Sequence, residues 1–121
     1  MFQIFTDFAN ENLVGKTVTF IPTAALPLIQ TQINAGKLFI GESAGAILLT
    51  PDIEYATDTD NPLAAPHLKT TKTLNIIDFY PVPHYKNDPL KEAVESVISK
   101  YGAKLQLVPF SNSQAILITG K

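Results

Sequence analysis

A serine flanked by two glycines is the part of this sequence with the clearest potential for chemistry. Residues 41–45 read Gly-Glu-Ser-Ala-Gly, and they follow the apolar segment Leu38-Phe39-Ile40. A Gly-x-Ser-x-Gly run between a strand and a helix is typical of a nucleophile elbow, a tight turn that exposes the serine hydroxyl. We therefore expect a strained backbone at Ser43. We also expect Gly41 and Gly45 to be required because a Cβ at either position would clash with the neighbouring turn.

A serine hydroxyl is a poor nucleophile until a base takes its proton. Of the two histidines in the chain, His84 is the better candidate because it ends a strand-like segment and Pro83 restricts its loop. A histidine that only caps a strand end remains the alternative interpretation. His67 lies in an acidic loop and fits a solvated surface position. The N–H of Ala44, at the start of the predicted helix, is a candidate donor to an oxyanion.

A histidine base must in turn be oriented by a carboxylate. Spacing alone does not choose among the acidic residues available for this role, and a solvated loop charge is the ordinary interpretation of each. The candidates are Asp52, Glu54, Asp58, Asp60 and Asp78.

The composition of the chain narrows the classes of function. With 121 residues, of which 45% are hydrophobic and 17% charged, it is expected to form a single soluble domain over residues 1–121. A net charge of −2 offers no basic surface for nucleic acid. The absence of cysteine excludes disulfides and thiolate sites, and we expect no metal or other cofactor. Without a signal-peptide pattern or a long apolar run, we expect no membrane association and a cytoplasmic location.

The elements that must position these residues alternate between helical and strand-like patterns. Helices are predicted at 2–12, 26–35, 44–49 and 88–101, and strands at 17–22, 38–41, 74–82, 105–109 and 115–119. The last two strands are predicted to form a hairpin through residues 111–114, and residues 51–73 form a long polar loop. This order predicts an α/β fold, with a mostly parallel sheet flanked by helices and a C-terminal hairpin.

Several segments together resemble the peptidase E family of serine peptidases, which comprises the aspartyl dipeptidases and, more distantly, cyanophycinase. The segments are Gly41-Glu42-Ser43-Ala44-Gly45-Ala46, Pro51-Asp52-Ile53-Glu54, Ile77-Asp78-Phe79 and Pro83-His84-Tyr85. The resemblance implies a fold similar to class I glutamine amidotransferases and hydrolysis of short peptides. It assigns the nucleophile to Ser43, the general base to His84 and the acid to Asp58, fifteen positions after the serine. Glu54 and Asp60 remain the alternative acids.

The chain also departs from the family in its first half. A Gly-Gly-Asn turn that supplies the second oxyanion donor in the family has no counterpart here, so the chain resembles an internally shortened member. Loss of one such donor lowers turnover by roughly 100- to 1,000-fold. A catalytically impaired, self-associating remnant and a small-molecule esterase are therefore the alternatives to a peptidase. Missing strands expose sheet edges, and we expect a homodimer whose partner covers residues 38–40. The resemblance leaves substrate specificity open.

Overall fold

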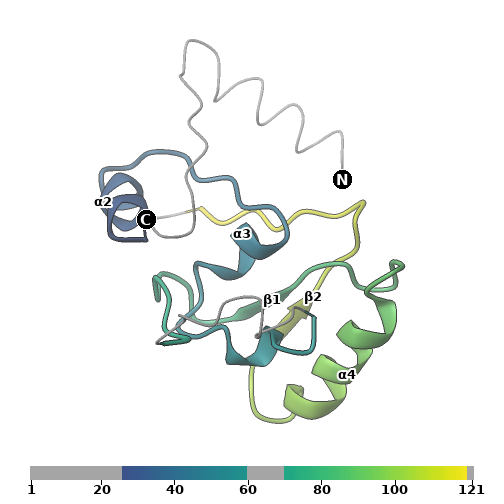
Figure 1. The fold of residues 1–121 in the computed structure, drawn as a ribbon. Coiled ribbons are helices and arrows are strands. Elements are labelled where there is room, and N and C mark those ends of the chain that lie inside the picture. The colour runs from purple at the N-terminus through teal and green to yellow at the C-terminus, as the bar shows by residue number, and fades with distance from the viewer. Residues whose placement is uncertain (1–25, 60–69, 120–121) are drawn as a thin grey trace. The chain divides into compact units, whose positions relative to one another are not determined.

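The computed structural model of the chain describes residues 26–59 and 70–119 (Figure 1). These residues fall into two compact units: residues 26–39 with 113–119, and residues 40–112. The second unit contains Ser43, Ala44, Asp58 and His84. The helix predicted at 2–12 and the strand predicted at 17–22 lie outside the described residues.

The first unit contains the helix α2 (Leu26–Asn34), which matches the predicted helix at 26–35. Gly36 ends the helix with a left-handed backbone, φ 82°. The N–H groups of Gly36 and Lys37 donate to the carbonyls of Ile33 and Gln32 at 2.9 and 3.1 Å, which satisfies acceptors of the last turn. Residues 115–119 do not form the predicted strand.

The second unit is built on a strand–helix–strand arrangement, shown in Figure 1. Strand β1 (Tyr80–Val82) is followed by the helix α4 (Lys91–Tyr101) and then by strand β2 (Leu107–Pro109). The two strands are parallel, and Val82 lies opposite Pro109 in the register. Parallel strands need a crossover connection, which is usually a helix. As a result, the carboxyl ends of β1 and β2 lie at the same edge.

The core of this unit forms where one face of α4 packs onto β1 and a short 3₁₀ helix, η2 (Glu54–Ala56). The buried residues of this cluster are Tyr55, Ala56, Val82, Val94 and Val97. The spacing of three between Val94 and Val97 places both side chains on one face of the helix. Full burial of such a side chain stabilises the fold by about 1.5–3 kcal/mol, so this cluster fixes the position of the β1 end.

Two strand predictions differ from the structure. Residues 38–41 form no strand, and of the predicted strand at 74–82 only Tyr80–Val82 is extended and paired. Apolar, β-branched sequence favours a strand only where a neighbouring strand offers hydrogen bonds. Leu38 and Ile40 are instead 42% and 48% exposed.

The predicted C-terminal hairpin is also wrong. Within the described residues, β2 pairs in parallel with β1 and not with a later strand. The physical reason is the crossover through α4, which brings β2 back alongside β1 in the same direction. The fold is nevertheless α/β with a small parallel sheet, as predicted.

Candidate active site

Ser43 occupies a strained turn directly before a short helix, α3 (Ala44–Ile47). Its backbone angles are φ 51° and ψ −115°, a conformation that non-glycine residues rarely adopt. The N–H of Gly45 donates to the Glu42 carbonyl at 2.8 Å, and the N–H of Ala46 donates to the Ser43 carbonyl at 3.0 Å. Such strain costs of order 1–3 kcal/mol and concentrates at functional sites. The prediction of a strained serine is confirmed, although no strand precedes it.

The steric reason expected for Gly45 does not hold. A Cβ at this position would meet no heavy atom within 4 Å, so close packing does not explain the glycine. Among the described residues of the turn, the unusual conformation is that of the Ser43 backbone, and steric crowding at Gly45 does not determine it.

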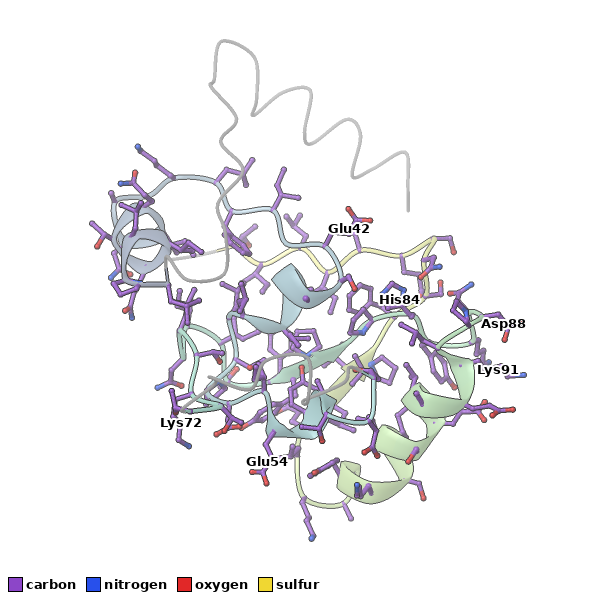
Figure 2. The ribbon with its side chains drawn as sticks, in the orientation of Figure 1. Glu42, Glu54, Lys72, His84, Asp88 and Lys91 are labelled. Carbon is purple, nitrogen blue, oxygen red and sulfur yellow. The ribbon has the colours of Figure 1, made fainter. Side chains whose placement is uncertain are left out.

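The predicted contact between the serine and the histidine is present. Ser43 Oγ lies 2.9 Å from His84 Nε2, which is within hydrogen-bond distance. His84 follows the end of β1 and has φ 64°, so the loop turns sharply at this residue. Figure 2 shows His84 beside the loop that carries Glu42, with the Glu42 carboxylate turned away from the ring. An exposed serine and a half-buried imidazole therefore form a preassembled pair.

The other ring nitrogen of His84 contacts Asn112, which the sequence did not reveal as a site residue. His84 Nδ1 lies 2.8 Å from Asn112 Oδ1. An amide oxygen only accepts hydrogen bonds, so Nδ1 carries the proton and donates it. The lone pair of Nε2 then faces Ser43 and can accept the hydroxyl proton. Asn112 thus sets the tautomer that a general base requires.

Backbone hydrogen bonds hold the two loops that carry His84 and Asn112 together. Beyond the paired strands, the N–H of Phe110 donates to the Val82 carbonyl, and the N–H of Tyr85 donates to the Phe110 carbonyl, both at 3.0 Å. The N–H of Asn112 donates to Asn87 Oδ1 at 2.8 Å. A prediction of the parallel pairing between β1 and β2 could have identified Asn112. This pairing places the residues that follow β2 beside those that follow β1.

The expected contact between Asp58 and His84 is not found. Asp58 instead accepts a hydrogen bond from Ser96 Oγ at 3.0 Å and pairs with Lys100 Nζ at 3.3 Å, both on α4. These partners hold the pKa of the Asp58 carboxyl below its ordinary value, the Ser96 hydrogen bond first and the Lys100 interactions second. Spacing along the chain matched Asp58 to the resemblance, but the turn after η2 directs its side chain to α4.

Among the alternative acids that the structure describes, none contacts His84 either. Asp52 accepts from the Glu54 N–H at 2.7 Å and pairs with Lys72 at 3.0 Å. Burial raises the pKa of Asp52, but hydrogen bonds from Glu54, Lys72 and Thr71 outweigh this effect and lower it overall. Glu54 is exposed. Asp60 and His67 lie outside the described residues.

Ala44, the expected oxyanion donor, follows Ser43 at the first position of α3 and lines the same cavity as Ser43 and His84. Ala44 is exposed at this end of the helix. The first N–H groups of a helix lack intrahelical partners and can stabilise a negative charge. The geometry is therefore compatible with this role.

The described part of the chain has neither a metal cluster nor a membrane-spanning helix. Residues 26–59 and 70–119 contain no cluster of three or more His, Asp or Glu side chains that could hold a metal ion. None of the described helices is long and apolar enough to cross a membrane.

Comparison with known proteins relates the chain to peptidases. The family model of peptidase family S51 matches residues 25–121. An uncharacterized peptidase of Listeria monocytogenes is 44% identical over 99 residues, covering 82% of this chain and 48% of the relative. An uncharacterized peptidase of Pasteurella multocida is 46% identical over 99 residues, again covering 82% of this chain and 48% of the relative.

A solved structure agrees with these sequence matches. The crystal structure of a Listeria monocytogenes protein, provisionally named a peptidase E, superposes with a TM-score of 0.66 at 41% identity. The match covers 74% of this chain and 43% of that one, and the chain spans about half the length of the curated relatives it matches. With a family model matched over most of its length and a serine–histidine pair at its elbow, the chain belongs to peptidase family S51.

Proposed function

We propose that this chain carries a serine-hydrolase site that cleaves short peptides, with Ser43 as nucleophile and His84 as general base. The 2.9 Å distance between Ser43 Oγ and His84 Nε2 is the observation that carries this proposal. The strained backbone of Ser43 supports it, because strain of this kind is retained at functional turns. Membership of a peptidase family supports peptides as the substrate class.

The proposed reaction follows from the order of the hydrogen bonds. His84 Nε2 takes the proton of the Ser43 hydroxyl while Oγ forms a bond to the carbonyl carbon of the substrate. The Ala44 N–H stabilises the oxyanion that results. The C–N bond then breaks, and His84 returns the proton to the leaving amine. Water hydrolyses the acyl ester by the same path in reverse and restores Ser43.

In this scheme Asn112 orients His84, the role that the resemblance assigned to Asp58. It accepts the Nδ1 proton of His84 and so orients the ring, at 2.8 Å. It is a neutral group, and it does not add a negative charge beside the imidazolium that forms during attack. The role proposed for Asn112 is therefore positioning and choice of tautomer.

Ester hydrolysis by the same site is the second candidate. The Ala44 N–H is one oxyanion donor, and the sequence has no counterpart of the glycine-rich turn that supplies the other in the family. An ester has a better leaving group than an amide, so it needs less stabilisation of the transition state. Comparing a peptide with the matched ester of the same acyl group distinguishes the two candidates.

A fluorophosphonate probe tests the proposal directly, because it forms a covalent bond with an activated serine. We expect labelling at Ser43, loss of labelling in Ser43→Ala, and labelling slowed by about 100- to 10,000-fold in His84→Ala. Ser96→Ala is the control, since Ser96 contacts the Asp58 carboxylate and not the histidine. Absence of label on Ser43 in the folded wild-type protein would overturn the proposal.

A further inference from the structure

A cavity of about 230 Å³ lies next to the serine–histidine pair. Ser43 and His84 both border it, and Ser43 is also exposed. The walls carry the apolar side chains of Ile47, Val82, Leu90 and Val97. An apolar cavity of roughly 150 Å³ is large enough to hold benzene. The volume here is therefore sufficient for a four-carbon side chain such as that of leucine.

The polar groups in the wall are already used within the protein. The Tyr55 hydroxyl donates to the Pro81 carbonyl at 2.6 Å, and the Thr59 hydroxyl donates to the Ala56 carbonyl at 2.7 Å. Burial raises the pKa of Tyr55, so its hydroxyl stays neutral. The hydroxyl groups of these two residues therefore already have hydrogen-bond partners within the protein.

No lysine, arginine, aspartate or glutamate is among the described residues that line the cavity. Lys100, on the helix that contributes Val97, is already paired with Asp58 and does not line the cavity. A carboxylate placed in this cavity would lose water and would find no lysine or arginine partner among the described residues of the wall, which is unfavourable. An apolar side chain would gain from the same loss of water.

We propose that this cavity binds the side chain of the residue whose carbonyl Ser43 attacks, and that it selects a branched apolar residue such as leucine over an acidic one. The inference rests on the proposed function, because it assigns the cavity to the acyl side of the bond that Ser43 cleaves. The position of the cavity, bordered by the nucleophile itself, favours the acyl residue over more distant parts of a peptide. The resemblance left the specificity open, and the proposed preference differs from that of the aspartyl dipeptidases in the family.

A matched pair of phosphonates measures this selectivity. Diphenyl aminophosphonates that carry an isobutyl group or a carboxymethyl group imitate leucine and aspartate at the acyl position and react with activated serines. We expect the leucine analogue to label Ser43 at least about tenfold faster, since each buried methylene in a hydrophobic pocket contributes 10-fold or more to selectivity.

Two threonine variants test whether the cavity is the source of the selectivity. Thr59→Lys places an ammonium group at the cavity wall and should shift the ratio of the two labelling rates towards the aspartate analogue. Thr57→Lys is the matched control, because the Thr57 hydroxyl also donates to a carbonyl three residues back but Thr57 does not line the cavity. The ratio should be unchanged in Thr57→Lys. An equal response of the two variants would assign the effect to net charge and overturn the inference.

The failure of this inference is distinguishable from the failure of the proposed function. If the fluorophosphonate labels Ser43 but the aspartate analogue reacts as fast as the leucine analogue, the cavity assignment is wrong and the catalytic site stands. If the fluorophosphonate does not label Ser43, the preference of the cavity can still be measured by ligand binding to Ser43→Ala, which requires no reaction at the serine. N-acetyl-leucinamide, but not N-acetyl-aspartamide, should then shift the methyl NMR signals of Val82 and Val97. Equal shifts, or none, would overturn the inference.

Discussion

At the scale of single residues, the site depends on how the histidine ring is held between two oxygen atoms. Ser43 Oγ and Asn112 Oδ1 lie 2.9 and 2.8 Å from opposite nitrogens of His84. A ring restrained at both nitrogens keeps one tautomer and one orientation. This arrangement makes the amide of Asn112, and not a carboxylate, the group whose removal should affect the base.

Two substitutions at Asn112 separate orientation from charge. Asn112→Ala removes the acceptor of the Nδ1 proton, so we expect fluorophosphonate labelling of Ser43 to slow by about 100- to 10,000-fold. Asn112→Asp keeps an acceptor and adds a negative charge that stabilises the imidazolium, so labelling should be at least as fast as in the wild type. The rate of labelling at pH 8 is the measurement.

The backbone provides the control for these variants. The Asn112 N–H, which donates to Asn87 Oδ1, is present in both substitutions, so the loop keeps its anchor. Unfolding midpoints of the two variants should therefore be similar. Labelling of Asn112→Ala at the wild-type rate would show that His84 does not depend on this contact.

Sequence patterns predicted part of this site for identifiable reasons. Ser43 and His84 were found because a glycine-flanked serine and a histidine at a strand end are local signals. Asn112 has no local signal: it lies in a polar turn, and its role depends on a strand register that joins residues far apart in the chain. The expected contact of Asp58 with His84 is absent for a related reason, since distance along the chain does not give the direction of a side chain.

At the scale of elements, the helix α4 connects β1 to β2 in the unit of residues 40–112. Its buried residues Val94 and Val97 pack on the core beneath β1, while Ser96 and Lys100 on another face hold Asp58. The amphipathic pattern of this helix made it predictable. The short elements were not, because β1, β2 and η2 have three residues each and owe their form to tertiary contacts.

Asp58→Asn tests whether this aspartate acts in stability and not in catalysis. The pKa of Asp58 is lowered in the folded protein, so its stabilising effect is present at pH values above the ordinary value of 3.8 and is lost as the pH falls through the lower folded pKa. We expect the melting temperature at pH 7 to fall by about 1–4 °C relative to wild type. The difference should shrink below pH 4, and labelling of Ser43 should be unchanged.

The control for this charge change is Asp78→Asn, an exposed aspartate that precedes β1. It removes the same charge without touching Ser96 or Lys100, so it should lower the melting temperature at pH 7 less than Asp58→Asn does. A large loss of labelling in Asp58→Asn at full folding would restore Asp58 to the catalytic group and count against the assignment of Asn112.

At the scale of the whole molecule, the chain has two compact units and exposes several large apolar side chains. Leu28, Leu38 and Leu117 in one unit are 53%, 42% and 57% exposed, and Ile40 in the other is 48% exposed. Such residues scattered singly are ordinary on protein surfaces. Leu38 and Ile40, however, lie two positions apart in the segment that leads to the elbow.

We propose that a second copy of the chain covers the segment of Leu38 and Ile40, and light scattering tests this. The wild-type protein should be a dimer at about 10 µM, a concentration that corresponds to roughly 7 kcal/mol of association free energy. Burial of each side chain contributes about 1.5–3 kcal/mol. The double substitution Leu38→Glu with Ile40→Glu should therefore weaken association by at least 100-fold and give a monomer. Ser99→Glu, an added charge on the exposed face of α4, should leave the dimer intact. A wild-type protein that stays a folded monomer at this concentration would contradict the proposal.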